Sequence, residues 1–113
     1  MSHLTISERP DGDAVVLDLS GDIIFGQSNT VLRREVRRLI AEGKTKINLN
    51  LTNVFYLDSS GCGELISALI ALNRVGGHLK LVNPGERIQE LLGISKLTMI
   101  FDIEYGENQA AGA

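Results

Sequence analysis

The apolar residues of this chain switch repeatedly between the spacing of a strand and the spacing of a helix. Stretches of period-two alternation or short apolar runs, both typical of strands, are followed by apolar residues three or four positions apart, which indicate helices. The predicted strands span 4–8, 14–19, 46–51, 78–82 and 99–105. The predicted helices span 28–43, 58–77 and 84–92. This order restricts the chain to a sheet whose later strands are joined through helices.

Capping residues set the boundaries of the predicted helices. Ser28 or Asn29 can cap the first helix, because short polar side chains accept hydrogen bonds from unpaired first-turn amides. Asp58 or Ser59 can cap the second helix in the same way. Gly43 ends the first helix, as glycine commonly does just past the last helical residue.

The connections between the predicted strands decide how the strands pair. The turn Pro-Asp-Gly-Asp at 10–13 joins the first two strands as an antiparallel hairpin, and Ser-Gly-Asp at 20–22 breaks the second strand. Single helices separate the later strands, which favours right-handed crossovers and parallel pairing. We therefore predict a small mixed β-sheet flanked by helices, an α/β fold in a single domain over 1–113, with the residues from about Glu107 onward frayed.

Composition argues against several functional classes. The chain has 113 residues and a formal net charge of −3, whereas nucleic-acid-binding domains usually carry a clustered basic face. Its single cysteine cannot form an internal disulfide, which fits a reducing cytoplasm. The sequence shows neither a signal peptide nor a run of about 18 apolar residues. We expect a cytoplasmic protein without membrane insertion and without direct contact to nucleic acid.

The stretch LDSSGCG at 57–63 lies where the third strand meets the second helix. Capping accounts for Asp58 or Ser59 but leaves a second hydroxyl unexplained. It also leaves Gly61 and Gly63 unexplained, since each glycine inside a helix costs about 1 kcal/mol relative to alanine. Two glycines in a first turn indicate a bare surface that another molecule can approach closely.

Two enzymatic interpretations of this stretch lack the residues that they need. A serine nucleophile requires a base, but His3 lies near a terminus, His78 lies at a strand edge, and the pattern is not Gly-x-Ser-x-Gly. A phospho-aspartyl receiver with Asp58 as acceptor requires further acids after the first strand, which enters a hairpin instead. We expect no catalytic residue, no metal and no cofactor.

The remaining interpretation is that a partner phosphorylates Ser59 or, less favoured, Ser60. A phosphate adds about −1.5 to −2 charges at pH 7. A helix N-terminus tolerates this charge through its dipole and its free amides. The modification would therefore spare the fold and act on a partner surface, where it adds like-charge repulsion beside Asp58 and a desolvation cost.

The segment NLTNVFYLDSSGCGELISAL at 50–69 resembles the signature of the STAS-domain anti-sigma factor antagonists, or anti-anti-sigma factors. VVLDLSGDI at 15–23 resembles the opening of that family, and GGHLKLVNPGERIQELLGISKLTMIFDI at 76–103 resembles its last third. The resemblance implies a STAS-like fold in which Ser59 is the phosphoacceptor. It further implies that Asp58 positions or polarises the Ser59 hydroxyl.

The resemblance also implies partner switching in bacterial transcription regulation. The unphosphorylated protein would bind an anti-sigma factor that is also a serine kinase, and would thereby release a sigma factor. The kinase would use its own ATP and magnesium to phosphorylate Ser59, and a PP2C-type phosphatase would restore binding. The alternative is a STAS interaction module of another assembly, a lipid-transport complex or a stressosome-like scaffold, without a phosphoswitch. On either interpretation the protein is a binder and not an enzyme.

A surface around Ser59 is expected to contact the partner, with Gly61 giving it access. Ile24 and Phe25 stand where the family often has an acidic residue, and they are either core residues or an apolar contact. The expected partner-binding residues are Asp22, Ile24, Phe25, Asp58, Ser59, Ser60, Gly61 and Gly63.

Four further features depart from the family or have a role that must be assigned. Asn50 replaces a common aspartate, and the segment after the last predicted strand is short for the family's last helix. Cys62 replaces a usual leucine, and a cysteine at such a position is more often a small buried hydrophobe than a reactive thiol. The first helix carries a stripe that is either a solvated face or a docking site for an acidic partner: Arg33, Arg34, Arg37 and Arg38.

Overall fold

A computed structural model of the chain describes residues 3–106, so the fraying expected from Glu107 onward lies outside the described residues. None of the helices in this part of the chain is long and apolar enough to cross a membrane. The elements are β1 (Thr5–Asp11), β2 (Ala14–Ile23), α1 (Gln27–Ala41), β3 (Lys46–Leu57), α2 (Ser59–Arg74), β4 (His78–Val82), α3 (Glu86–Ile94), a 3₁₀ turn (Leu97–Met99) and β5 (Asp102–Glu104).

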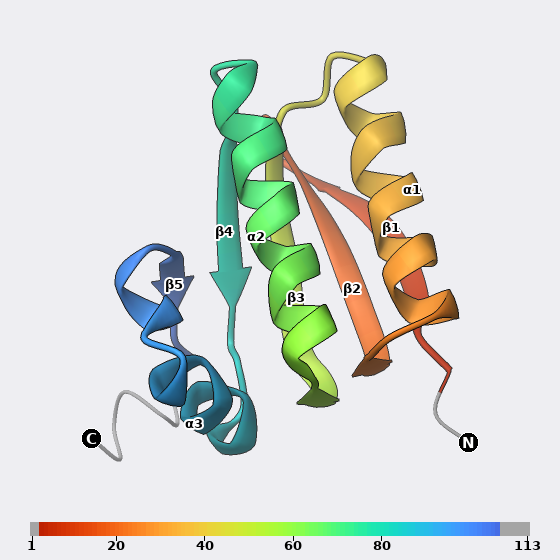
Figure 1. Ribbon diagram of the computed structural model, residues 1–113. Coiled ribbons are helices and arrows are strands. Elements are labelled where there is room, and N and C mark those ends of the chain that lie inside the picture. Colours follow the sequence, from red (N-terminus) through yellow and green to blue (C-terminus); the bar gives the residue numbers. More distant parts are fainter. Residues whose placement is uncertain (1–2, 107–113) are drawn as a thin grey trace.

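The strands form one sheet in the order β1-β2-β3-β4-β5, which is also their order along the chain (Figure 1). β1 and β2 pair antiparallel, as expected for a hairpin closed by a tight turn. Every later neighbour pairs parallel, because a helix or helical turn carries the chain back between strands. The predicted mixed sheet with an N-terminal hairpin is confirmed.

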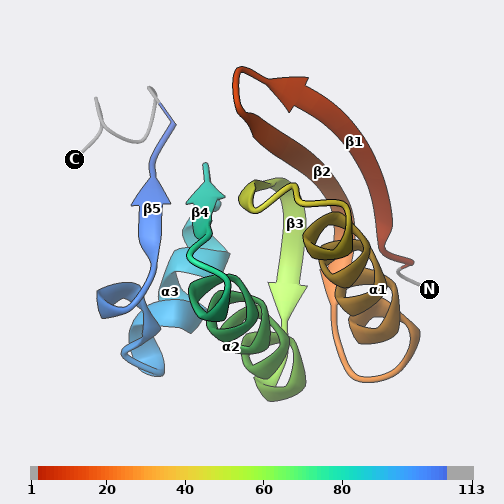
Figure 2. The same cartoon turned by 90° about the horizontal axis from the view of Figure 1, so that it is seen from above.

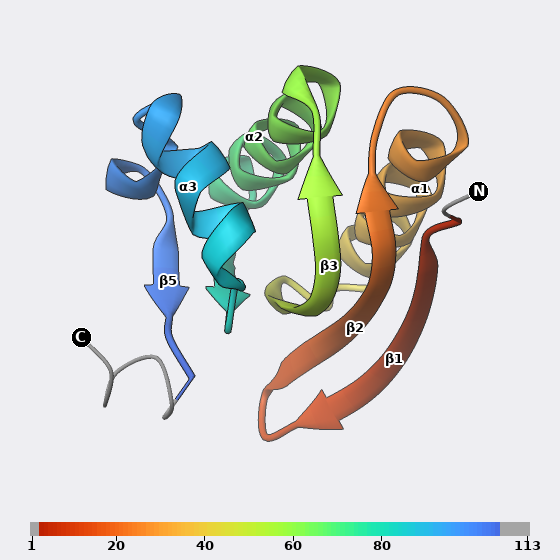
Figure 3. The same ribbon diagram turned by 90° about the horizontal axis from the view of Figure 1, so that it is seen from below.

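α1 and α2 lie side by side on one face of this sheet, and both run against the direction of the parallel strands (Figure 1, Figure 2). α3 lies beyond the end of β4 and packs beside β3 (Figure 3). The Arg87 guanidinium of α3 stacks over the Tyr56 ring of β3, 5.8 Å from its centroid. α3 therefore contacts β3 close to the carboxyl end of that strand.

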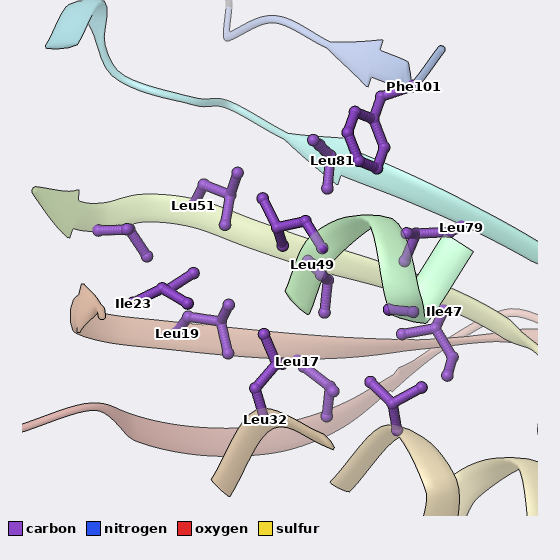
Figure 4. Close-up of a cluster of buried hydrophobic side chains, with 14 of the residues drawn as sticks. Leu17, Leu19, Ile23, Leu32, Ile47, Leu49, Leu51, Leu79, Leu81 and Phe101 are labelled. Carbon is purple, nitrogen blue, oxygen red and sulfur yellow. The ribbon is translucent and has the colours of Figure 1, made fainter. Parts of the chain in front are cut away.

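Aliphatic side chains fill the space between the sheet and the two long helices (Figure 4). Alternate residues of each inner strand point to this face, as the pleat of a strand requires. Among the described residues, Phe101 is the single aromatic member of the buried cluster, so leucine, isoleucine and valine do nearly all of the packing. The strand residues that contribute include Leu17, Leu19, Ile47, Leu49, Leu51, Leu79 and Leu81.

β2 and β3 are longer than the sequence pattern predicted. The break expected at 20–22 is wrong, because β2 continues to Ile23 through register shifts at Asp18/Ser20 and Gly21/Asp22. A side chain at Gly21, whose φ is +120°, would place its Cβ 2.1 Å from the His3 carbonyl oxygen. The glycine therefore admits the incoming N-terminal segment, and it does not end the strand.

The other element boundaries differ less from the prediction. β1 begins and ends slightly later than expected and α3 is shifted by two residues at both ends, while β5 is confined to Asp102–Glu104 behind a 3₁₀ turn. The cap predicted for α1 is wrong. The helix starts after Gly26, whose φ is +105°, and no side chain caps it, whereas Ser28 and Asn29 are buried within its first turn.

A chain of polar side chains crosses the face of the sheet opposite α1 and α2. The Arg9 guanidinium donates to the Asp18 carboxylate, with 2.7 Å between Nε and Oδ2. The Asn50 amide donates to the same carboxylate at 2.7 Å and accepts from the Thr52 hydroxyl at 2.6 Å. These hydrogen bonds lower the pKa of Asp18, with Arg9 making the larger contribution and Asn50 the next. Asn50 thus acts here as a neutral donor.

An aspartate at position 50 should destabilise the protein in a pH-dependent way. Asn50→Asp keeps the shape but replaces the donor to Asp18 by a second carboxylate, which should lower the free energy of unfolding by about 1–3 kcal/mol at pH 7. In the natural chain the lowered pKa of Asp18 contributes stability that is present above about pH 4 and is lost as the pH falls through the folded-state value. The deficit of the variant should therefore shrink toward pH 4, where protonation relieves the repulsion.

Urea unfolding at pH 7 and pH 4 measures this effect. Asn48→Asp is the matched control, because Asn48 lies two residues earlier on the same face of β3 and has no hydrogen bond to a carboxylate within residues 3–106. A deficit of Asn50→Asp that is the same at both pH values would contradict the repulsion argument.

Candidate functional site

The candidate site lies where β2 and β3 end side by side. The two strands stay paired to their last residues, with Ile23 opposite Leu57. Because the carboxyl ends of neighbouring parallel strands meet at one edge of a sheet, the loop at 24–26 and the N-terminus of α2 are brought together (Figure 3). All eight residues expected to bind a partner lie in these segments or in the last residues of β2.

The Asp58 carboxylate ties the two segments together. Its Oδ1 accepts from the Gly61 amide at 2.7 Å, which makes Asp58 the N-cap of α2. Its Oδ2 accepts from the Phe25 amide at 3.0 Å. The Asp58 amide in turn donates to the Ile23 carbonyl oxygen at 3.3 Å. Asp58, and not Ser59, is therefore the cap, and it also fixes the loop at 24–26 against the start of α2.

This geometry bears on the role that the family resemblance implied for Asp58. Both carboxylate oxygens accept from backbone amides, and within residues 3–106 Asp58 makes no hydrogen bond to the Ser59 hydroxyl. Asp58 therefore positions Ser59 by shaping the turn before it.

The two adjacent serines stand in different environments. Ser59 is exposed, and its hydroxyl has no hydrogen-bond partner within the described residues. Ser60 is half-buried, and its hydroxyl accepts from the side-chain amide of Asn29 in α1. The Asn29 side-chain oxygen is buried and finds no partner in residues 3–106. Ser60 and Asn29 thus connect α2 to α1, while Ser59 remains available on the surface.

The two glycines of the stretch also differ. Gly61 is buried, and a Cβ there would lie 2.0 Å from the Ile23 carbonyl oxygen and 3.1 Å from the Leu57 Cβ. The interpretation of Gly61 as bare surface is therefore wrong, because this glycine lets α2 approach the end of β2. Gly63 is exposed, and a Cβ there would meet no other part of the described chain within 4 Å, so this glycine does leave the helix surface bare.

Cys62 packs against the hydrophobic core and is only partly accessible. Burial raises the pKa of its thiol, and the negative charge of Asp58 raises it further. A raised pKa keeps the group in the thiol form, which is a poor nucleophile. Cys62 is a small apolar residue, as its position in the pattern indicated.

An ion pair behind the site, between a buried acid and an exposed arginine, was missed from the sequence. Glu64 of α2 is only 5% exposed and pairs with Arg33 of α1 through two hydrogen bonds, of 2.6 and 3.2 Å. The signal was a lone acid in the apolar half of the second helix, but its partner lies 31 positions away and only the fold brings the two together. The arginine stripe is therefore not uniform, because Arg33 braces α1 against α2.

Exposed apolar and small residues surround Ser59. The Phe25 side chain is 83% exposed, whereas Ile24 is half-buried. Asp22 is half-buried within β2, opposite Tyr56. The outward face of α2 continues from Ser59 with four exposed positions that carry no charge, which we call the α2 stripe: Ser59, Gly63, Ser67 and Ile70. A helix face exposed to water usually carries charged residues, so this face is unusual for a solvated surface.

The sequence of the chain matches the STAS domain family over residues 5–110, so the chain belongs to that family. Among characterised relatives it is similar to the anti-sigma-B factor antagonist of Bacillus subtilis, with 29% identity over 101 residues that cover 89% of this chain and 91% of the relative. It is also similar to the anti-sigma-B factor antagonist of Staphylococcus epidermidis, with 35% identity over 65 residues, 58% of this chain and 60% of the relative.

Solved structures show the same fold. An anti-sigma factor antagonist from Mycobacterium paratuberculosis has a TM-score of 0.78 at 18% identity, covering 97% of this chain and 92% of the other. The anti-sigma factor antagonist SpoIIAA in its unphosphorylated form has a TM-score of 0.69 at 20% identity, covering 96% and 94%. The Bacillus cell fate determinant SpoIIAA in the phosphorylated form has a TM-score of 0.68 at 22% identity, covering 97% of both chains.

Alanine at the two glycines should have opposite effects on stability. Gly61→Ala forces a methyl group into the Ile23 carbonyl and should lower the free energy of unfolding by about 2–4 kcal/mol. Gly63→Ala meets open space within a helix and should raise it by about 0.5–1 kcal/mol. Thermal unfolding followed by circular dichroism compares the pair. A Gly61→Ala protein as stable as the natural one would contradict the close approach of α2 to β2.

Proposed function

We propose that this protein is a cytoplasmic anti-sigma factor antagonist whose binding is switched off by phosphorylation of Ser59. The observation that carries the proposal is the contrast between the two serines: within the described residues Ser59 is exposed and unpartnered, and Ser60 is held by Asn29. Membership of the STAS family and the similarity to antagonists of sigma-B regulation support the antagonist role. The existence of SpoIIAA structures in both forms supports the switch.

Phosphate on Ser59 would spare the fold. Ser59 is the first residue of α2, where the helix dipole and the unpaired amides favour negative charge. The buried contacts of the helix, from Ser60 and Glu64, belong to neighbouring residues that stay unmodified. The modification changes the surface of the protein and leaves its core intact.

The same phosphate would disrupt a bound partner. It adds about −1.5 to −2 charges at one end of the uncharged α2 stripe and next to the Asp58 carboxylate. A partner shaped for small neutral side chains must then desolvate this charge without a counter-charge, which costs several kcal/mol in a buried contact. The partner is the anti-sigma factor, which on this proposal is also the serine kinase that supplies ATP and magnesium, and a PP2C-type phosphatase reverses the reaction.

Incubation with the candidate kinase, ATP and magnesium should place one phosphate on Ser59. Mass spectrometry of the natural protein, Ser59→Ala and Ser60→Ala locates it, and Ser60→Ala is the matched control because it removes the neighbouring hydroxyl. We expect modification of the natural protein and of Ser60→Ala, and none of Ser59→Ala. Phosphate on Ser60 alone would overturn the assignment, and no phosphate on either would favour a STAS module without a switch.

Binding to the anti-sigma factor should depend on charge at position 59. Ser59→Ala should keep the natural affinity, and Ser59→Glu should weaken it by about tenfold or more, because like charge and desolvation both act at the contact. Isothermal titration calorimetry measures both variants. Equal affinities for the two would argue against the charge mechanism.

Phe25 should contribute strongly to the same binding. A large aromatic side chain that is 83% exposed beside the switch residue has the character of an interface anchor, and truncating such an anchor costs about 1–2 kcal/mol or more. Phe25→Ala should therefore weaken binding by about 5- to 30-fold without lowering the melting temperature. Met99→Ala is the control, because Met99 is equally exposed (85%) but lies in the 3₁₀ turn before β5. Unchanged affinity of Phe25→Ala would exclude the loop at 24–26 from the interface.

A further inference from the structure

A polar seam runs between α1 and α2. At the start of the helices the Asn29 amide donates to the Ser60 hydroxyl. Four residues farther along each helix, Arg33 pairs with Glu64. Because residues four apart stack on one side of a helix, Arg37 is the next α1 position along this seam. The two helices run in the same direction, so the next α2 position lies opposite it (Figure 2).

The third position of the seam has no acid. Where a partner for Arg37 would stand, α2 carries the small residues Ser67, Ala68 and Ala71. Their size leaves a hollow of about 160 Å³ between the helices. The residues that line it are Leu32, Arg33, Val36, Arg37, Glu64, Ser67, Ala68 and Ala71.

Arg37 is left without a counter-charge within residues 3–106, although the chain has more acids than bases. The other positions of the stripe show the contrast. Arg38 is surrounded by Glu8, Glu35 and Glu42, and three carboxylates raise its pKa above the ordinary value. Arg33 forms an ion pair with Glu64 and donates a hydrogen bond to each of its two carboxylate oxygens. The hollow therefore adjoins one cation that nothing in the described chain neutralises.

We infer that this hollow binds a carboxylate side chain of a partner protein, with Arg37 as its charge partner. A hollow of about 160 Å³ has room for a short carboxylate side chain such as that of glutamate. The Ser67 hydroxyl can donate to the incoming group, and Arg33 has five N–H donors of which Glu64 takes two. The bottom of the hollow is aliphatic, which suits the methylene groups of such a side chain.

A protein supplies this carboxylate better than a free anion does. Ser67 belongs both to the hollow and to the α2 stripe, so a partner seated on the stripe lies directly over the hollow. A single unpaired guanidinium that is open to solvent holds a free anion only weakly, whereas attachment to a seated partner raises the local concentration of the group. The inference concerns recognition by charge, and the chemistry of the hollow does not depend on phosphorylation of Ser59.

A blocked tripeptide, acetyl-Ala-Glu-Ala-amide, tests the site without any knowledge of the partner. Titrated into the ¹⁵N-labelled full chain, it should shift the backbone amides of Ser67, Ala68 and Ala71 in a saturable way, with an affinity in the millimolar range expected for one charge-assisted contact. The tripeptide with glutamine in place of glutamate should not produce these shifts. High salt should reduce them, because the contact is open to screening.

Two arginine variants make the test specific. Arg37→Gln should weaken the binding by about tenfold, whereas Arg34→Gln should leave it unchanged, because Arg34 is exposed on the same helix, lacks an ion pair in the described chain and does not line the hollow. Circular dichroism establishes that both variants are folded.

Three results would overturn the inference: no saturable shift with the glutamate peptide, equal shifts with the glutamine peptide, or equal binding by Arg37→Gln. Inorganic phosphate is titrated in parallel. Shifts of the same amides with phosphate but not with the peptide would show a free-anion site and would also overturn it. None of these results depends on the kinase experiment, so the two proposals fail or stand separately.

Discussion

The Asp58 carboxylate holds together the two segments of the candidate site, the loop at 24–26 and the start of α2. One oxygen caps α2 by accepting from the Gly61 amide, and the other accepts from the Phe25 amide. Both contacts depend on β2 and β3 remaining paired to Ile23 and Leu57, because only then do the two loops leave the sheet at the same level. Because Gly61 has no side chain, the start of α2 can approach the end of β2 closely. The pairing of β2 with β3, the close approach of α2 to β2 and the cap by Asp58 thus depend on one another. Together they determine where Phe25 and Ser59 lie on the surface.

Around this arrangement the chain separates residues that hold the fold from residues that are available to a partner. Ser60 and Glu64 point their polar groups toward α1, where Asn29 and Arg33 receive them. Positions one residue away in sequence, Ser59 and Gly63, face outward. A helix allows this alternation because successive side chains are about 100° apart around its axis. A charge added on the outer side therefore lies away from the contacts that join the helices.

The sequence predicted the order of the elements and the mixed sheet, because periodicity and connection length are local properties. It did not predict the full length of β2 and β3, since the register shifts near Gly21 disturb the alternation on which strand recognition relies. The motif also pointed to Ser59 and to the loop at 24–26, and the fold brings these two segments together through Asp58. The role of Asn29 was misjudged, because asparagine near a helix start suggests a local cap, whereas its actual partner Ser60 is 31 residues away. The ion pair of Glu64 with Arg33 was not predicted either, because these two residues are also 31 positions apart.

The two ends of the seam between α1 and α2 differ in charge. A buried carboxylate such as Glu64 is tolerated only when its partner satisfies it, so Arg33 is committed to the fold. Arg38 is committed as well, through three carboxylates. What remains along the seam is neutral at the Ser59 end and positive at the Arg37 end, which lie a little over two helical turns apart. On the two proposals made above, a partner that brings a neutral contact to the first and an acid to the second would bind the unmodified protein. Phosphate at Ser59 would make the first contact negative, so the same partner would then have to desolvate a charge for which it offers no counter-charge.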